Sequence, residues 1–546
     1  MFPSILLLFL HLMGQAKVTQ PCPEACICFD ETVFCSDKEI AYIPRNIPPG
    51  TLEIIFVETP ICEVETRAFS HCSSLSKVVF LNTRLKTLER DAFGGLPKLR
   101  DLEITGSPLG GLRAQAFSDL TRLSKLTVNF NSLTSLEVGT FDGMGTLEEL
   151  HLKGNRFQNL TEGVFHPLTY LKTLNLAQNR LALVPEKLFE PLVHLRILKL
   201  SDNNISTLPQ CVFWTLTHLE ELFLDGNGIL ELSPDIFSRL SQLQHLWLQN
   251  NSIAHLPSSI FSSLGTLTFL NLERNQLQQV PAGLLGQTLS LERLSLSHNR
   301  LKTLDEETFR NLSKLSTIEL SHNLLSALPA GIFQDLTGVT ELYLGSNNLT
   351  SLHRDLFQNL SRLGKLSLPN NRLETLPEGI FDSNSKLFNL ALGGNPWACD
   401  CHLAYLSDYL QMFMDGMVDG QTYCDSPAHL NGSDLLRLRL DQLVCPLTPG
   451  EARLHFSQSE KQELGGPWDP TIGDKAPGSC TYRNPEGTVI LSCDRSTCRW
   501  LSLHLPPRKD SGSPGLAYNS SQDWVLDSNC GSVRLTVAVD ALGGEG

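Results

Sequence analysis

The sequence predicts an α/β repeat protein: a curved solenoid with one parallel concave sheet, a cysteine-rich cap at each end and a small β module at the C-terminus. Three observations predict this fold. An asparagine recurs at one constant interval, as at Asn131, Asn155 and Asn179, twelve times up to Asn395 without insertion or deletion. Leucines keep the same frame around it, and cysteines cluster immediately before and after the array. Because each repeat can bury its apolar face only against its neighbours, the array is expected to stack into one elongated core.

The motif Leu-x-x-Leu-x-Leu-x-x-Asn-x-Leu, as in Leu171, Leu174 and Leu176, resembles that of the leucine-rich repeat family, which implies one short strand per repeat. Repeats open at the same constant interval from Thr51 to Leu387, which gives fifteen strands within residues 51–394. The strand leucines are expected to point inward, and each asparagine amide to bond backbone groups of its own and the neighbouring turn. Hydroxyl residues replace the asparagine in the first three repeats: Thr59, Thr83 and Ser107.

A second periodic position is aromatic and lies on the convex side of each repeat. Its period equals that of the asparagines and so matches the stacking of repeats, and we interpret it as a core spine and not as an aromatic ligand site. The series is Phe69, Phe93, Phe117, Phe141, Phe165, Phe189, Phe213, Phe237, Phe261, Leu285, Phe309, Phe333, Phe357 and Phe381.

The N-terminal residues 1–20 are predicted to be a secretory signal peptide, since residues 2–13 form an apolar run too short to span a bilayer. Fifteen cysteines and eight Asn-x-Ser/Thr sequons agree with export. The net charge of −15 and the absence of a basic run argue against nucleic-acid or membrane partners. The protein is therefore expected to be secreted into the extracellular space. The expected glycosylation sites are Asn159, Asn204, Asn250, Asn311, Asn348, Asn359, Asn431 and Asn519.

Two cysteine clusters resemble the terminal caps of extracellular leucine-rich repeat proteins. They occupy residues 21–50 and 395–446, and zinc binding is the alternative for the first cluster. Residues 402–413 have helical apolar spacing and would cover the last repeat. The resemblance implies the disulfides Cys22–Cys28, Cys26–Cys35, Cys399–Cys424 and Cys401–Cys445.

The remaining cysteines are harder to assign. Cys62 and Cys72 lie in the first repeat, and a disulfide between them would staple its loop. Cys211 is left over, either as a free thiol or as an intermolecular link. Residues 447–478 read as a linker, and residues 479–546 as a small β module whose four cysteines allow three connectivities: Cys480, Cys493, Cys498 and Cys530.

Motifs for catalysis are absent from the sequence. It contains no Gly-x-Ser-x-Gly motif, phosphate loop or dinucleotide fingerprint. His218 and Glu221 have a spacing used by zinc carboxypeptidases, but the repeat frame places them on a strand and its approach, with no third ligand. We therefore expect no catalytic residues, no metal site and no cofactor.

The most distinctive surface is expected on the concave sheet. The third and fifth repeat positions place Ile197, Phe223, Trp247 and Phe269 on four successive strands. Aromatic anchors are typical of protein interfaces, so these residues are a candidate partner-binding surface. The alternative is that the rings only cover one another. Acidic residues flank this surface: Glu221, Asp225 and Glu273.

Several stretches are similar to the large non-catalytic subunits of plasma carboxypeptidase N. They are residues 56–60, 78–85 and 389–406 and, in the C-terminal module, residues 480–494. The resemblance implies a regulatory subunit that binds and stabilises a zinc carboxypeptidase in a hetero-oligomer and keeps it in circulation, while the partner removes C-terminal Arg or Lys from peptides. Two alternatives are a free-standing recognition protein for a pathogen or matrix ligand and an enzyme in its own right.

Overall fold

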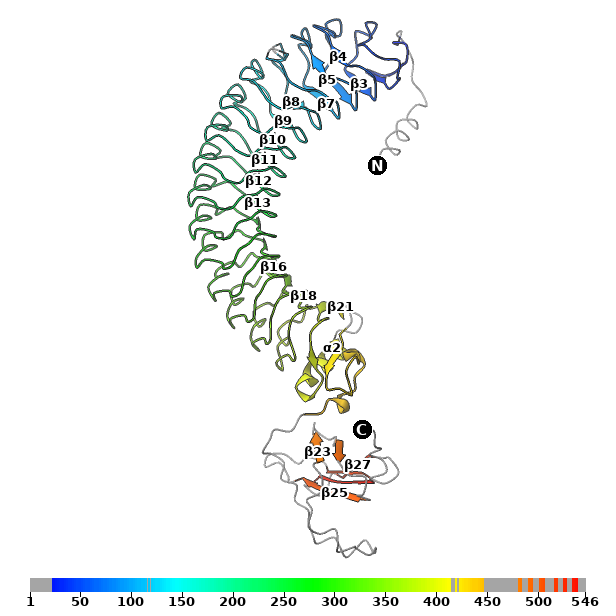
Figure 1. Ribbon diagram of the computed structural model, residues 1–546, viewed down its shortest axis with the longest axis vertical. Coiled ribbons are helices and arrows are strands. Elements are labelled where there is room, and N and C mark those ends of the chain that lie inside the picture. The colour runs from blue at the N-terminus through cyan, green and yellow to red at the C-terminus, as the bar shows by residue number, and fades with distance from the viewer. Residues whose placement is uncertain are drawn as a thin grey trace, which may run out of the picture. The chain divides into compact units, whose positions relative to one another are not determined.

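The computed structural model describes residues 22–445 apart from 115, 118, 414–417 and 420–421, together with the backbone of six strands between Cys480 and Ala538 (Figure 1). Two compact units divide the chain. The first runs to Asn347 and includes residues 356–363 and 383–386, and the second holds the rest. The expected signal peptide and the expected linker lie outside the described residues.

A parallel sheet with one strand per repeat forms the backbone of the first unit. Strands β7 to β13 follow one another in Figure 1. The strands are β3 (Glu53–Val57), β5 (Lys77–Leu81), β7 (Asp101–Thr105), β8 (Lys125–Thr127), β9 (Glu149–His151), β10 (Thr173–Asn175), β11 (Ile197–Lys199), β12 (Glu221–Phe223), β13 (His245–Trp247), β14 (Phe269–Asn271), β15 (Arg293–Ser295), β16 (Thr317–Glu319) and β17 (Glu341–Tyr343). The second unit adds β18 (Lys365–Ser367) and β19 (Asn389–Ala391), so the prediction of fifteen strands is confirmed.

Each asparagine lies in the turn after its strand, where its side chain bonds backbone groups of its own and the preceding repeat, as Asn179 does after β10. The Asn179 amide nitrogen donates to the carbonyl oxygens of Leu152 and Leu176, at 3.1 and 3.0 Å. Its side-chain oxygen accepts from the Phe157 amide at 3.2 Å. Asn179 is buried, so these bonds offset the free-energy cost of removing its amide group and the bonded backbone groups from water. The Thr83 and Ser107 hydroxyls, 2.8 Å apart, form a weaker substitute.

The convex side is built from successive turns and the phenylalanine spine. In one repeat the amides of Leu188, Leu192 and Leu195 each donate to the carbonyl three residues earlier. These tight turns leave no room for a regular helix, and the only α-helix in the described residues is α2 (Ala404–Phe413), which agrees with the helix predicted in the C-terminal cap. Spine rings such as Phe213 and Phe237 stack with their centroids 6.4 Å apart.

The N-terminal cap is a short antiparallel hairpin of β1 (Cys26–Phe29) and β2 (Thr32–Cys35). Strand β2 also pairs in parallel with β3, which closes the first edge of the sheet. The cap contains the disulfides Cys22–Cys28 and Cys26–Cys35, as the resemblance implies.

The C-terminal cap covers the sheet with α2 and short elements around it. They are β20 (Trp397–Ala398), β21 (Val418–Asp419), β22 (Cys424–Ser426), η2 (Cys401–Leu403), η3 (Leu435–Arg437) and η4 (Leu440–Gln442). Strand β21 pairs in parallel with β19, and Trp397 is fully buried and donates its indole N–H to the Leu392 carbonyl at 3.2 Å. The disulfides Cys399–Cys424 and Cys401–Cys445 close the cap, again as implied.

The expected disulfide between Cys62 and Cys72 is wrong. Both are free thiols; Cys62 is exposed and Cys72 is buried. The repeat frame gives the reason, because Cys72 occupies the core position that Leu96 and Leu120 hold in the next two repeats. Its side chain therefore packs inward, whereas Cys62 faces solvent. Cys211 is a third free thiol.

Three antiparallel strand pairs make up the described backbone beyond residue 479. They are β23 (Cys480–Arg483) with β24 (Ile490–Cys493), β25 (Trp500–Leu505) with β28 (Val533–Ala538), and β26 (Gly515–Tyr518) with β27 (Trp524–Asp527). This pairing agrees with the β character predicted for the module. The disulfides expected among Cys480, Cys493, Cys498 and Cys530 fall outside the described side chains.

Candidate partner-binding surface

The register of the sheet places the outward side chains of β11 to β14 in two rows. The first row runs Ile197, Glu221, His245, Phe269, and the second runs Lys199, Phe223, Trp247, Asn271. Strands β11, β12 and β13 lie side by side (Figure 1). A short separation between neighbouring strands brings the members of a row into contact.

Three aromatic rings form the centre of this surface. Phe223 and Trp247 stack almost parallel, with centroids 3.8 Å apart and an interplanar angle of 6°. Phe269 lies diagonally from Trp247 at 5.3 Å, with its plane tilted by 42°. All three side chains are half-buried. The rings therefore cover one another in part, yet each keeps some surface for another molecule. We call Phe223, Trp247 and Phe269 the aromatic surface.

Two further residues contact the aromatic surface, and neither was predicted from the sequence. The Lys199 ammonium lies over the Phe223 ring, 4.6 Å from its centroid. His245 lies on β13 with Trp247, 5.5 Å from the Trp247 ring and 6.2 Å from the Phe269 ring. Both occupy outward repeat positions, so the frame that identified Phe223 could have found them had polar residues been included.

The remaining predicted residues surround the aromatic surface in different ways. Ile197 lies opposite Glu221 in the first row, so it borders the rings and does not join their stack. Glu221 lies 3.7 Å from the His245 ring nitrogen. Asp225 accepts a 2.7 Å hydrogen bond from the Ser201 hydroxyl, and Glu273 pairs with Arg274 at 3.3 Å.

Burial disfavours the charged forms of two carboxylates near these strands. It is the main cause that raises the pKa of Asp225, and the nearby Asp202 adds to the rise. Burial also raises the pKa of Glu319 on β16, with further contributions from Glu273 and Glu341. This part of the sheet therefore carries negative charge that the fold only partly compensates.

The predicted glycosylation sites are accessible where the structure describes them. Six of these asparagines are exposed, Asn348 is half-buried, and Asn519 falls outside the described residues. Asn250 follows β13 by three residues and has a left-handed backbone with φ of 54°. A glycan at Asn250 would leave the chain close to Trp247 and limit the size of a partner there.

His218 and Glu221 do not converge on a common ligand. The His218 ring nitrogen Nδ1 bonds the Val193 carbonyl at 3.0 Å, and the ring stacks on His194 at 6.3 Å. Glu221 instead faces His245 on the sheet. Among the described residues, one group has metal-ligand proximity, Asp400, Cys401 and His402, but Cys401 is bound in a disulfide and offers no thiolate.

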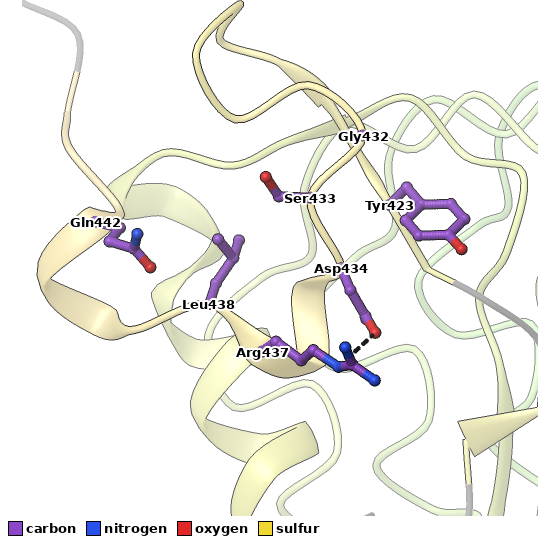
Figure 2. Close-up of a pocket in the computed structure, with 7 residues that line it drawn as sticks. All are labelled: Tyr423, Gly432, Ser433, Asp434, Arg437, Leu438 and Gln442. Carbon is purple, nitrogen blue, oxygen red and sulfur yellow. Dashed lines mark ion pairs between the residues drawn. The ribbon is translucent and has the colours of Figure 1, made fainter.

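Two hollows occur away from the aromatic surface. Figure 2 shows the one in the C-terminal cap, about 530 Å³, where the Arg437 and Asp434 side chains pair with each other at 3.6 Å. The other, about 620 Å³, lies beside the N-terminal cap, and there Lys77 pairs with Glu53 at 2.9 Å. In both, the basic side chain already pairs with a carboxylate. Among the residues that the structure describes, no helix has the length and apolar character needed to cross a membrane.

The repeats match a known family model. The model described as leucine rich repeat matches residues 73–133, 121–181, 169–229, 217–277, 290–349 and 337–396. Among solved structures, a leucine-rich repeat protein of Leptospira interrogans has a TM-score of 0.61 and 28% identity, covering 70% of this chain and 93% of that chain. A chain of the Toll–Spatzle complex of Drosophila has a TM-score of 0.64 at 22% identity, covering 84% of this chain and 64% of that chain, which shows the fold alone.

Two curated relatives share more of the local sequence. Over 149 residues the chain is 55% identical to Carboxypeptidase N subunit 2 of Homo sapiens, and this match covers 27% of each chain. The protein of the same name in Mus musculus is 49% identical over 149 residues, with the same coverage. The match thus spans little more than a quarter of the length of these relatives.

Proposed function

This chain belongs to the leucine-rich repeat family, and we propose that it is a non-catalytic regulatory subunit that binds and stabilises a secreted zinc carboxypeptidase in a hetero-oligomer. The observation that carries the proposal is the 55% identity to Carboxypeptidase N subunit 2 of Homo sapiens. In this proposal catalysis, and the removal of C-terminal Arg or Lys from peptides, belong to the partner. Binding to the folded enzyme stabilises it by mass action, and a larger, glycosylated particle stays longer in plasma.

The aromatic surface is the proposed contact for the enzyme. Half-buried rings of Trp and Phe supply most of the binding energy in many interfaces when a partner covers them. Trp247 lies at the centre, stacked on Phe223 and tilted against Phe269. Charged neighbours such as Glu221 then form the rim, which favours orientation and association rate over affinity.

The test is complex formation by the whole secreted chain. We expect light scattering after size exclusion to give a combined mass when the catalytic subunit of carboxypeptidase N is added. Replacing both Trp247→Ala and Phe223→Ala is expected to weaken the complex by at least roughly tenfold, because the rings lose their contact area. Trp214→Ala is the control, since Trp214 is 41% exposed and lies on a convex turn outside the sheet.

Three outcomes separate the alternatives. A chain that keeps its own mass at micromolar enzyme would overturn the proposal and favour free-standing recognition. A complex that the double variant leaves unchanged would place the contact elsewhere on the chain. Peptidase activity of the isolated chain would establish an enzyme instead. Circular dichroism of each variant checks that the repeats remain folded.

A further inference from the structure

We propose that the aromatic surface and the carboxylates beside it recognise an arginine-bearing basic segment of a partner polypeptide. This deepens the proposed function and rests on it only for the identity of the partner.

Two carboxylates at this surface, Asp225 and Glu221, have no ion pair with Lys or Arg within the described residues. Asp225 forms no ion pair at all in the part of the chain that the structure describes: its carboxylate accepts a hydrogen bond from the Ser201 hydroxyl at 2.7 Å, and burial raises its pKa more than the nearby Lys199 lowers it. Glu221 has only the His245 ring, 3.7 Å away, which is a cation only when protonated. A half-buried carboxylate that is not held in a close ion pair with Lys or Arg is unfavourable in its charged form, so an incoming cation gains more from it than from an exposed, paired one.

The neighbouring cations are already engaged. The Lys199 ammonium lies over the Phe223 ring, and Arg274 pairs with Glu273. Arg293 lies next to Phe269 on β15, where it repels a second cation. A cationic ligand is therefore favoured at Trp247 on β13, between Lys199 on β11 and Arg293 on β15 and beside Glu221 on β12.

The shape of this position favours arginine over lysine. A guanidinium is planar, stacks on indole and phenyl faces, and binds a carboxylate through two parallel hydrogen bonds. Trp247 has one face against Phe223, and its 42° tilt to Phe269 prevents that ring from closing the other face completely. A lysine ammonium would satisfy the charge but would leave this planar contact unused.

The test uses the full secreted chain and three blocked peptides: hexaarginine, hexalysine and hexacitrulline. We expect calorimetry to show hexaarginine binding at least roughly tenfold more tightly than hexalysine, and no binding of uncharged hexacitrulline. The double variant Glu221→Gln with Asp225→Asn is expected to weaken hexaarginine binding by at least roughly tenfold. Trp247→Leu is expected to remove the preference for arginine.

A matched control separates a local site from the overall negative charge. Glu190→Gln with Glu231→Gln removes two exposed carboxylates outside the sheet and produces the same change in net charge. Equal losses in the two double variants, or equal binding of hexaarginine and hexalysine to the native chain, would overturn the inference.

Competition with the catalytic subunit distinguishes this inference from the proposed function. Displacement of the enzyme by hexaarginine supports both. An enzyme complex that forms but withstands saturating hexaarginine overturns the inference and leaves the proposed function standing. Arginine-selective peptide binding without any enzyme complex overturns the proposed function and leaves the inference standing.

Discussion

At the scale of single residues, the position in the repeat decides the role more strongly than the residue type. Cys72 takes the place of a core leucine, and Cys211 takes a turn position where Gly379 stands in a later repeat. Both are free thiols, although the cysteines of the two caps form disulfides. The frame thus explains why Cys62 and Cys72, close together in the sequence, face opposite directions.

The buried Cys72 thiol is expected to make the stability of the fold depend on pH. Burial raises the pKa of the Cys72 thiol from 9.0 to about 11, so the unfolded chain loses this proton at a lower pH than the folded chain. Its contribution to the free energy of unfolding is fully present below about pH 9 and is lost as the pH rises to about 11. Relative to Cys72→Val, the native chain is expected to lose up to roughly 2–3 kcal/mol over this range, at about 1.4 kcal/mol per pKa unit.

Urea denaturation at a series of pH values measures this difference. The Cys72→Val variant is the reference because lysine and tyrosine residues titrate in the same range in both proteins. Parallel pH profiles for the two proteins would contradict the prediction. Cys62→Ser, at an exposed thiol, should leave the profile of the native chain unchanged.

The sequence predicts the positions of residues in this fold better than the contacts between them. Because stacking reproduces one environment in every repeat, the strands and the spine follow from the frame, and the caps follow from the cysteine clusters that resemble those of the family. The contacts of Trp247 and Phe223 do not follow from the frame. The stacking of Trp247 on Phe223 and the position of Lys199 over Phe223 depend on side-chain rotamers, which a repeat frame does not determine. The prediction that Cys62 pairs with Cys72 is wrong for the same reason, because closeness in the sequence does not determine which way two side chains point.

At the scale of elements, the phenylalanine spine links each repeat to its neighbours. Phe237 is fully buried and stacks on Phe213 and Phe261, at 6.4 and 6.3 Å. Leu285 interrupts the aromatic series one repeat after Phe261, and it is itself buried. The spine therefore tolerates a change of apolar shape better than a loss of volume.

Replacing Phe237→Ala tests the spine. The change leaves a cavity between two rings and is expected to cost about 3–5 kcal/mol of stability. Hydrogen exchange should rise first in β11 to β13, because the repeats of these strands contain Phe213, Phe237 and Phe261, which surround the cavity. Trp214→Ala, at a 41% exposed ring, should alter stability far less. An equal rise in hydrogen exchange along the whole array would show that the loss of stability is not local.

At the scale of the whole molecule, the caps protect the chain from associating with itself. Apolar repeat ends exposed to water form contiguous patches that favour association. The cap side chains Val33 and Trp397 are almost completely buried, and two disulfides hold each cap in place.

Reduction of the cap disulfides is expected to make the protein associate in a concentration-dependent way. Light scattering after size exclusion measures the mass with and without reductant. Alkylating the exposed Cys62 beforehand excludes a trivial cross-link through that thiol. A reduced protein that stays monomeric at every concentration would show that the caps hold their shape without their disulfides.

The asparagine hydrogen bonds also determine which insertions and deletions the fold can accept. The Asn179 and Asn251 amides each reach a carbonyl 27 residues earlier in the chain, so every bond spans the same length of sequence. A recombination event that adds or removes the codons of one whole repeat leaves this spacing intact and joins compatible surfaces. An insertion of one codon in a strand shifts every later side chain of that repeat out of phase. Change in this molecule is therefore expected to come in whole repeats or in single outward side chains, and the outward positions of the sheet are where new specificity can arise without refolding the chain.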